Sequence, residues 1–224
     1  MPSKYYTRNF ETGNFYHIYN RGANKQKIFL KPKDYQVFTK ILSYFLTHPT
    51  GKIFSYLNKA SQPYKRKGLP PTNSSVHLIS YCLMPNHFHL LLKQEAEPTA
   101  QNSITNLMRR LSITYSMYFN QKYQHAGALF ESKYKNVSIT SPEQLLHLTK
   151  YIHKNPKNFS DYPYSSYSDF LPTSHPGSWI YPEDILFYFS KTNPNNSYKN
   201  FVEEKSIDSE IIQPLTIECY GSEP

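Results

Sequence analysis

Two histidines one residue apart stand out among the residues of this sequence that could do chemistry. His87 and His89 lie in HFHLLLKQ, whose apolar pattern is typical of a strand. Successive side chains of a strand point to opposite faces, so both imidazoles are expected on one face of a sheet. There they could chelate one divalent metal ion, although a histidine pair satisfied by hydrogen bonds is the commoner outcome. A third ligand is needed to favour the metal.

A predicted helix near residue 150 supplies candidates for that ligand. In YIHKNP, Tyr151 and Asn155 are four residues apart and therefore share one helix face. Asn155 offers an amide oxygen, and Tyr151 offers a phenol that can act as a nucleophile. Taken alone, Asn155 is more simply explained as a helix cap and Tyr151 as a core aromatic. Together with the histidine pair, they favour a functional site.

A second predicted helix offers a poorer set of the same residue types. It contains Tyr115, Tyr118 and Asn120. At 3.6 residues per turn, Tyr115 and Asn120 are offset by roughly 140° around the helix, so they would not easily reach one metal ion.

The elements that must position these residues predict an α+β fold. Strands are predicted at residues 14–20, 76–84 and 87–94, with an extended segment at 128–139. Helices are predicted at 34–47, at 100–123 and from Ser141 to the residue before Pro156. The third of these helices starts with a capping box made by Ser141, Pro142 and Gln144. A tight turn at Pro85 and Asn86 would join the two middle strands as a hairpin.

The order strand, helix, strand, strand, helix, strand, helix resembles a ferredoxin-like, split βαβ sandwich. Such a fold has an antiparallel sheet with helices packed mainly on one face. Residues 49–75 are expected to form a basic loop with a short strand at KIFSYL, and a short helix is expected near 182–190.

Composition narrows the class of protein. The chain has 224 residues, a formal charge of +9 and two cysteines, and neither cysteine belongs to a CxxC pair. A positive surplus of this size favours a polyanionic partner, most often nucleic acid. The N-terminal stretch has no apolar segment of a signal peptide, and no apolar run approaches the roughly 20 residues of a membrane span. We therefore expect a soluble cytoplasmic protein without a membrane partner.

Five motifs carry a resemblance to a known family. FYHIYNRG, YCLMPNHFHLLL, ALFESKYKNV, YIHKNP and YPYSSY occur in that order. They resemble the REP-associated tyrosine transposases, a branch of the HUH single-strand DNA transposases related to the IS200-like enzymes. The resemblance covers about residues 14–170. It implies a catalytic domain at 1–170 and leaves 171–224 as a C-terminal extension of unknown role.

The resemblance also implies roles for individual residues. His87 and His89 match the histidines of the HUH motif, Tyr151 matches the nucleophile, and Asn155 takes the place of a third metal ligand that is glutamine in other branches. The implied cofactor is Mg or Mn, and the implied partner is single-stranded or hairpin DNA. The implied reaction is strand cleavage through a 5′-phosphotyrosine intermediate.

The positive charge suggests which residues contact the DNA backbone. The candidates are Arg21, Lys25, Lys27, Arg109, Arg110, Lys133 and Lys135.

Three other interpretations stay open: an inactive nucleic-acid-binding module, a zinc-dependent hydrolase and a structural metal site. The choice between monomer and homodimer also stays open.

Overall fold

The computed structural model describes residues 9–48, 75–99, 103–172, 177 and 179–204. The predicted basic loop at 49–75, with its strand at KIFSYL, lies almost wholly outside these residues.

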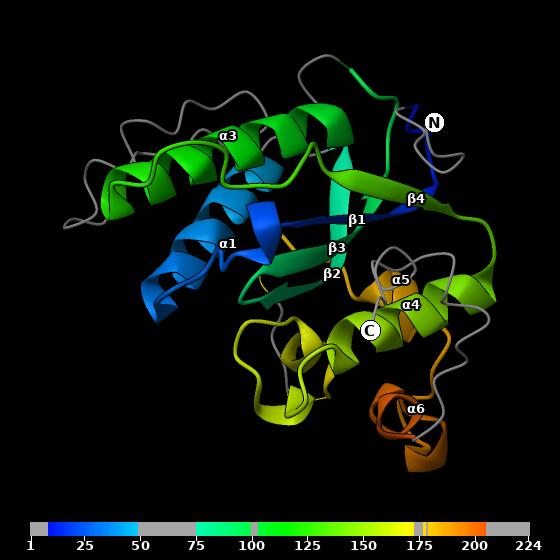
Figure 1. Cartoon of the computed structure of the whole chain (residues 1–224). Coiled ribbons are helices and arrows are strands. Elements are labelled where there is room, and N and C mark those ends of the chain that lie inside the picture. Colours follow the sequence, from blue (N-terminus) through cyan, green and yellow to red (C-terminus); the bar gives the residue numbers. More distant parts are fainter. Residues whose placement is uncertain (1–8, 49–74, 100–102, 173–176, 178, 205–224) are drawn as a thin grey trace, which may run out of the picture.

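The described chain forms four strands and three long helices (Figure 1). The strands are β1 (Phe15–Arg21), β2 (Val76–Met84), β3 (His87–Gln94) and β4 (Lys135–Ile139), and the long helices are α1 (Pro32–Thr47), α3 (Ile104–Tyr123) and α4 (Pro142–Lys154). Two short helices follow, α5 (Glu183–Leu186) and α6 (Tyr198–Glu203). Single 3-10 turns lie at Ala23–Lys25, Phe159–Asp161, Tyr167–Phe170 and Pro194–Asn196.

The strands form one sheet in the order β2-β3-β1-β4, and every neighbouring pair is antiparallel. α1 crosses from β1 to β2, and α3 crosses from β3 to β4, so each crossover skips a neighbouring strand. This is the predicted ferredoxin-like arrangement, and the α+β class is confirmed.

Local sequence signals set the element boundaries closely. β2 and β3 have the predicted bounds, and the turn between them is Pro85 and Asn86. The Ser141 hydroxyl accepts a hydrogen bond from the Gln144 amide at 3.2 Å, which caps α4 as predicted. The Gln144 side chain reaches back to the amide of Thr140, one residue earlier than in a standard capping box.

Helices cover both faces of the sheet, and each face has its own hydrophobic core. The first core lies between the sheet and the α1–α3 pair, and includes Ile18, Phe38, Phe88, Leu111 and Tyr115. The second core lies between the opposite face and α4, and includes Tyr19, Cys82, Leu91, Leu148 and Tyr151. α1 and α3 thus share one face and α4 covers the other, so the prediction that the helices pack mainly on one face is corrected: each face carries apolar side chains that a helix must cover (Figure 1).

The region beyond residue 170 contributes to the second core. Ile185 of α5 and Tyr198 and Val202 of α6 are buried in it. His153 of α4 joins α4 to this region, because its Nδ1 lies 2.6 Å from the Tyr198 hydroxyl. Its Nε2 lies 2.8 Å from the hydroxyl of Ser166, just before the region. Burial lowers the pKa of His153 to about 3, so the ring is a neutral cross-link.

A buried carboxylate joins α1 to α3. Asp34 caps α1 by accepting the backbone N–H groups of Leu30 and Lys31, at 2.9 and 2.8 Å. It also accepts hydrogen bonds from Lys122, Tyr118 and Tyr123 of α3, at 2.5, 2.9 and 2.7 Å, and this second set lies wholly on one helix. Burial opposes ionisation, but the hydrogen bonds from Lys122, Tyr123, the Lys31 amide and Tyr118 outweigh it and lower the pKa of Asp34.

We predict that Asp34→Asn lowers the free energy of unfolding by about 2–4 kcal/mol at neutral pH, because it removes the charge that these donors surround. A carboxyl whose folded pKa is lowered stabilises the protein above its unfolded pKa, and that stabilisation is lost as the pH falls through the folded value. The gap between wild type and variant should therefore narrow in acid. Urea unfolding over a pH series measures this difference in unfolding free energy. The control is Glu203→Gln, which removes the charge of the exposed pair with Lys199 and is expected to cost less than about 0.5 kcal/mol. An equal difference in unfolding free energy at every pH would contradict the conclusion that Asp34 is ionised in the folded protein.

Candidate functional site

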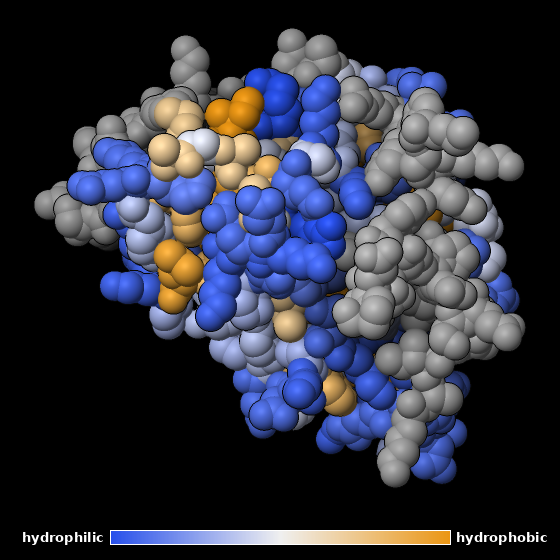
Figure 2. Space-filling model, viewed as in Figure 1, coloured by the Kyte–Doolittle hydropathy of each residue, from blue (hydrophilic) through white to orange (hydrophobic). Residues whose placement is uncertain are grey.

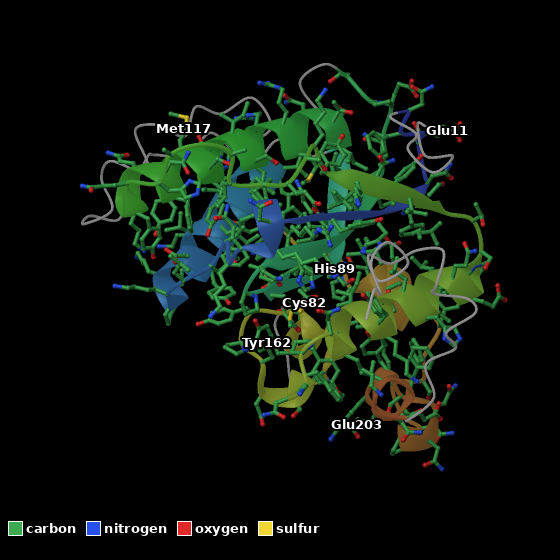
Figure 3. The ribbon with its side chains drawn as sticks, viewed as in Figure 1. Glu11, Cys82, His89, Met117, Tyr162 and Glu203 are labelled. Atoms are coloured by element: carbon green, nitrogen blue, oxygen red, sulfur yellow. The ribbon has the colours of Figure 1, made fainter. Side chains whose placement is uncertain are left out.

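The site lies on the face of the sheet that α4 covers. β3 places His87 and His89 on this face, and the antiparallel register sets Arg21 of β1 opposite His87 and Tyr19 opposite His89. On the other side of β1, Lys135 of β4 is opposite Tyr19. Figure 3 shows His89 between the sheet and α4. Residues from three strands and one helix thus meet over the end of the β2–β3 hairpin.

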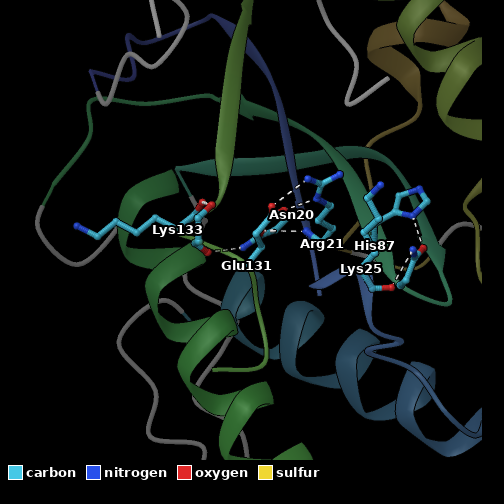
Figure 4. Close-up of polar contacts among 8 residues, drawn as sticks. Asn20, Arg21, Lys25, His87, Glu131 and Lys133 are labelled. Atoms are coloured by element: carbon cyan, nitrogen blue, oxygen red, sulfur yellow. Dashed lines mark hydrogen bonds and ion pairs between the residues drawn. The ribbon is translucent and has the colours of Figure 1, made fainter. Parts of the chain in front are cut away.

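The Nδ1 edge of the His87 ring contacts the hairpin turn. Its Nδ1 lies 2.8 Å from Oδ1 of Asn86, whose Nδ2 donates to the Lys25 carbonyl at 3.4 Å (Figure 4). An amide oxygen only accepts, so this contact is a hydrogen bond when Nδ1 of His87 carries the hydrogen. Burial lowers the pKa of His87, and the Arg21 charge lowers it further against a hydrogen bond with Asn155. The ring is therefore neutral at pH 7 and carries its one hydrogen on either Nδ1 or Nε2.

The Nε2 of His87 faces α4 and lies 3.2 Å from Oδ1 of Asn155, the residue that ends the helix. A ring protonated on Nε2 donates to Asn155 here, whereas a ring protonated on Nδ1 donates to Asn86 and leaves Nε2 able to bind a cation together with Oδ1 of Asn155. The predicted ligands His87 and Asn155 are thus brought into direct contact.

His89 is buried more deeply, with 0% of its surface exposed. Its Nδ1 lies 2.9 Å from Nε2 of His17, and its own Nε2 has no hydrogen-bond partner among the described residues. Its ring centroid is 5.0 Å from that of His87. Burial, with smaller contributions from His17 and His87, lowers the pKa of His89 well below the ordinary value. A buried imidazole nitrogen without a partner fits a metal ligand.

Tyr151 packs directly on this pair. The ring stands edge to face against His89, with the centroids 5.5 Å apart at 85°, and 8% of the residue is exposed. The helical spacing that places Tyr151 on His89 also places Asn155 on His87, one turn further along α4. The alternative tyrosines lie elsewhere: Tyr115 is in the first core, where its hydroxyl donates to the Ile28 carbonyl at 2.6 Å.

The donor set fits a divalent cation. Two neutral imidazole nitrogens and one amide oxygen provide three uncharged ligands, which leave coordination positions for phosphate or water. The described residues hold no group of three His, Cys, Asp or Glu side chains able to bind a metal. A metal at this point therefore depends on Asn155 completing the pair of histidines.

Three positively charged side chains lie beside the imidazoles. Arg21 makes a two-pronged ion pair with Glu131, in which one guanidinium nitrogen lies 2.9 Å from Oε1 (Figure 4). The hydrogen bond from Arg21 is the largest influence that lowers the pKa of the Glu131 carboxyl, and the charges of Arg21, Lys135 and Lys25 add to it. Three predicted DNA-binding residues thus surround one carboxylate and leave a local excess of positive charge.

The remaining predicted DNA-binding residues are distributed more widely. Lys27 and Lys133 are exposed, and Lys133 extends away from Glu131 (Figure 4). Arg109 and Arg110 lie on α3, the layer opposite α4, where Arg109 donates to Asn106 at 2.8 Å and Arg110 stacks on the Phe45 ring at 3.8 Å. They do not converge on the imidazole site.

Sequence reasoning missed three residues of the site. His17 and Asn86 lie behind His89 and His87, and Glu131 holds Arg21. His17 carried a signal, because it alternates with Tyr19 and Arg21 along β1 and so had to share their face. Glu131 lies in a loop, where no periodicity fixes the direction of a side chain.

Parts of this chain are similar to known proteins. Residues 71–155 match the family model described as "Transposase IS200 like". A REP-associated tyrosine transposase bound to a REP hairpin is similar at 15% identity with a TM-score of 0.49, over 75% of this chain and 85% of that one. A candidate transposase of Deinococcus radiodurans R1 is similar at 16% identity with a TM-score of 0.38, over 66% of this chain and 94% of that one. Among curated proteins none matches.

Proposed function

We propose that this chain is a metal-dependent enzyme that nicks and joins single-stranded DNA at stem–loops through a 5′-phosphotyrosine intermediate, because residues 71–155 match the IS200-like transposase model. The observation that carries the metal is the contact between Nε2 of His87 and Oδ1 of Asn155, beside a buried His89 nitrogen that has no hydrogen-bond partner among the described residues. The part of the chain that the structure describes holds no helix long and apolar enough to cross a membrane. Location in the cytoplasm stays a prediction.

His87, His89 and Asn155 would hold the metal ion. When bound, the ion would act as a Lewis acid toward a non-bridging oxygen of the scissile phosphate and would help to orient that group. Because all three ligands are neutral, the protein leaves the charge of the ion uncompensated, and a phosphate is the natural anion to complete the site. We propose Mg or Mn as the ion, and nitrogen ligands favour Mn of the two.

Tyr151 would be the nucleophile. Its phenolic oxygen attacks phosphorus in line with the bond to the 3′-oxygen, so that one P–O bond forms as the other breaks. The products are a 5′-phosphotyrosine and a strand that ends in a 3′-hydroxyl, with the phenolic proton transferred through water to the leaving oxygen. The covalent bond preserves the energy of the phosphodiester, so a second 3′-hydroxyl can reverse the step without ATP.

The cations around Glu131 would hold the DNA strand. Arg21 sits opposite His87 in the sheet, where a backbone phosphate next to the scissile one would lie. Lys25 and Lys135 extend the positive surface, consistent with the charge of +9 on the whole chain. Binding of a phosphate by Arg21 would compete with its ion pair to Glu131.

A zinc hydrolase would need a carboxylate base near metal-bound water. Glu131 is the carboxylate closest to this role in the described site, but its oxygens are engaged by Arg21. This pairing favours the tyrosine mechanism.

We predict that Tyr151→Phe abolishes the covalent protein–DNA adduct on a labelled hairpin with Mn²⁺, while hairpin binding changes less than about threefold. Tyr115→Phe is the matched control, since its hydroxyl bonds only within the first core, and it should still form the adduct. Denaturing gel electrophoresis separates the outcomes. Cleavage by Tyr151→Phe without an adduct would point to a hydrolase, and no cleavage by wild type would point to an inactive binding module.

We predict that Asn155→Ala weakens Mn²⁺ binding by about 10–100-fold, because one of three protein ligands is lost. Isothermal titration of the DNA-free protein measures the affinity. Asn158→Ala, just beyond the helix, is the control and should bind like wild type. Equal affinity in Asn155→Ala would refute the proposed ligand set.

We predict that Arg21→Ala weakens hairpin binding and reduces the salt dependence of the binding constant by about one phosphate contact. Glu131→Gln should keep or increase the affinity, since it frees the guanidinium from its partner. Lys199→Ala on α6, far along the chain from the site, should leave both values unchanged. If Arg21→Ala and Glu131→Gln weaken binding equally, the ion pair is structural and Arg21 does not contact DNA.

A further inference from the structure

A third histidine lies behind the site and is not a member of the proposed donor set. His17, on the middle strand β1, has 0% of its surface exposed and reaches across to β3, where its Nε2 lies 2.9 Å from Nδ1 of His89. The two rings are nearly parallel, with centroids 5.1 Å apart and 17° between their planes. The contact joins the side of His89 that faces away from the unpartnered Nε2.

The contact between two imidazole nitrogens holds one hydrogen, and its position decides what His89 can do. If His17 donates, Nδ1 of His89 is the acceptor, and a neutral His89 carries its hydrogen on Nε2, where it blocks a metal. If His89 donates, its Nε2 is bare and carries a lone pair. Both rings are buried, and the pKa of His89 is held low mainly by burial, so a doubly protonated ring is disfavoured.

Two observations decide between these arrangements. A hydrogen on the Nε2 of His89 would be a buried donor with no acceptor among the described residues, which carries a cost of about 1–3 kcal/mol. A bare Nε2 is an acceptor that a cation can satisfy. The neighbouring His87 offers the same arrangement, since a hydrogen on its Nδ1 is accepted by the Asn86 oxygen behind it and leaves Nε2 bare.

We propose that His17 is a positioning residue that accepts a hydrogen bond from Nδ1 of His89 and thereby keeps the His89 Nε2 unprotonated and aimed at the metal. Asn86 and His17 then serve as matching acceptors behind the two imidazole ligands. Acceptors of this kind fix the tautomer and ring orientation of metal-binding histidines and raise their basicity. This inference rests on the proposed metal site, but the tautomer that it specifies exists without metal.

The direct test is the tautomer of His89 in the metal-free protein. Long-range ¹H–¹⁵N NMR of protein labelled at histidine separates a protonated ring nitrogen from a bare one, and His89→Ala identifies the His89 signals. The inference requires a protonated Nδ1 and a bare Nε2 in wild type. A protonated Nε2 would overturn it, whether or not the protein binds metal.

Two substitutions test the consequence. His17→Leu removes the acceptor and is expected to weaken Mn²⁺ binding by about 10–100-fold, and His17→Gln, whose amide oxygen can replace the acceptor, should restore most of the affinity. His125→Leu, beyond the end of α3, controls for loss of a histidine elsewhere. Wild-type affinity in folded His17→Leu would refute the inference. If His17→Leu does not fold, His17→Gln decides: a bare Nε2 on His89 with retained affinity supports the role, and a protonated Nε2 with retained affinity refutes it.

The same experiments separate this inference from the proposed function. If wild type binds no Mn²⁺, the metal site fails while the NMR result still shows which nitrogen carries the hydrogen. If wild type binds Mn²⁺ with His89 protonated on Nε2, the metal site stands without His89 as a ligand, and the role of His17 fails.

Discussion

The contact between His87 and Asn155 joins the sheet to α4, and the proposed site depends on it. The Nε2 of His87 lies 3.2 Å from Oδ1 of Asn155. β3 is hydrogen-bonded on both sides, and α4 is packed on the second core through Leu148, Tyr151 and Ile152. The energy of burial thus holds the strand and the helix at the distance that brings these two atoms together. In the proposed function, a cation at this point would bind both atoms.

Burial also controls the protonation of the site. His89 is fully buried and His87 is half-buried, and desolvation is the main cause that lowers the pKa of each ring. Neutral imidazoles are the form that binds metal, so the same packing that places the proposed ligands keeps them in that form. The cations Arg21, Lys25 and Lys135 lie around Glu131 instead. Neutral proposed ligands with positive charge beside them suit the polyanionic substrate of the proposed function.

The two layers of the molecule have different roles. The α1–α3 layer is tied together by Asp34 and its partners on α3, and its tyrosines use their hydroxyls in structural hydrogen bonds. The α4 layer carries the proposed site, and His153 joins α4 to Ser166 and to Tyr198 of α6. Figure 2 shows apolar residues gathered at the upper left of the viewed face and hydrophilic residues over much of its middle. The region beyond residue 170 therefore supports the helix that holds Tyr151 and Asn155, although the family resemblance does not extend to it.

The sequence by itself determined the β2–β3 hairpin and the three long helices, and it selected four residues of the proposed site, because those follow from short-range patterns. Alternation along HFHLLLKQ placed His87 and His89 on one face, and a spacing of four placed Tyr151 and Asn155 on one helix face. Local patterns do not predict which face of the sheet α4 covers. That choice depends on how the apolar side chains are divided between the two cores. Only the tertiary structure brought His17 behind His89, set Glu131 on Arg21 and separated Arg109 and Arg110 from the site. These contacts join residues far apart in sequence, so strand register and layer packing select them, and no local pattern records them.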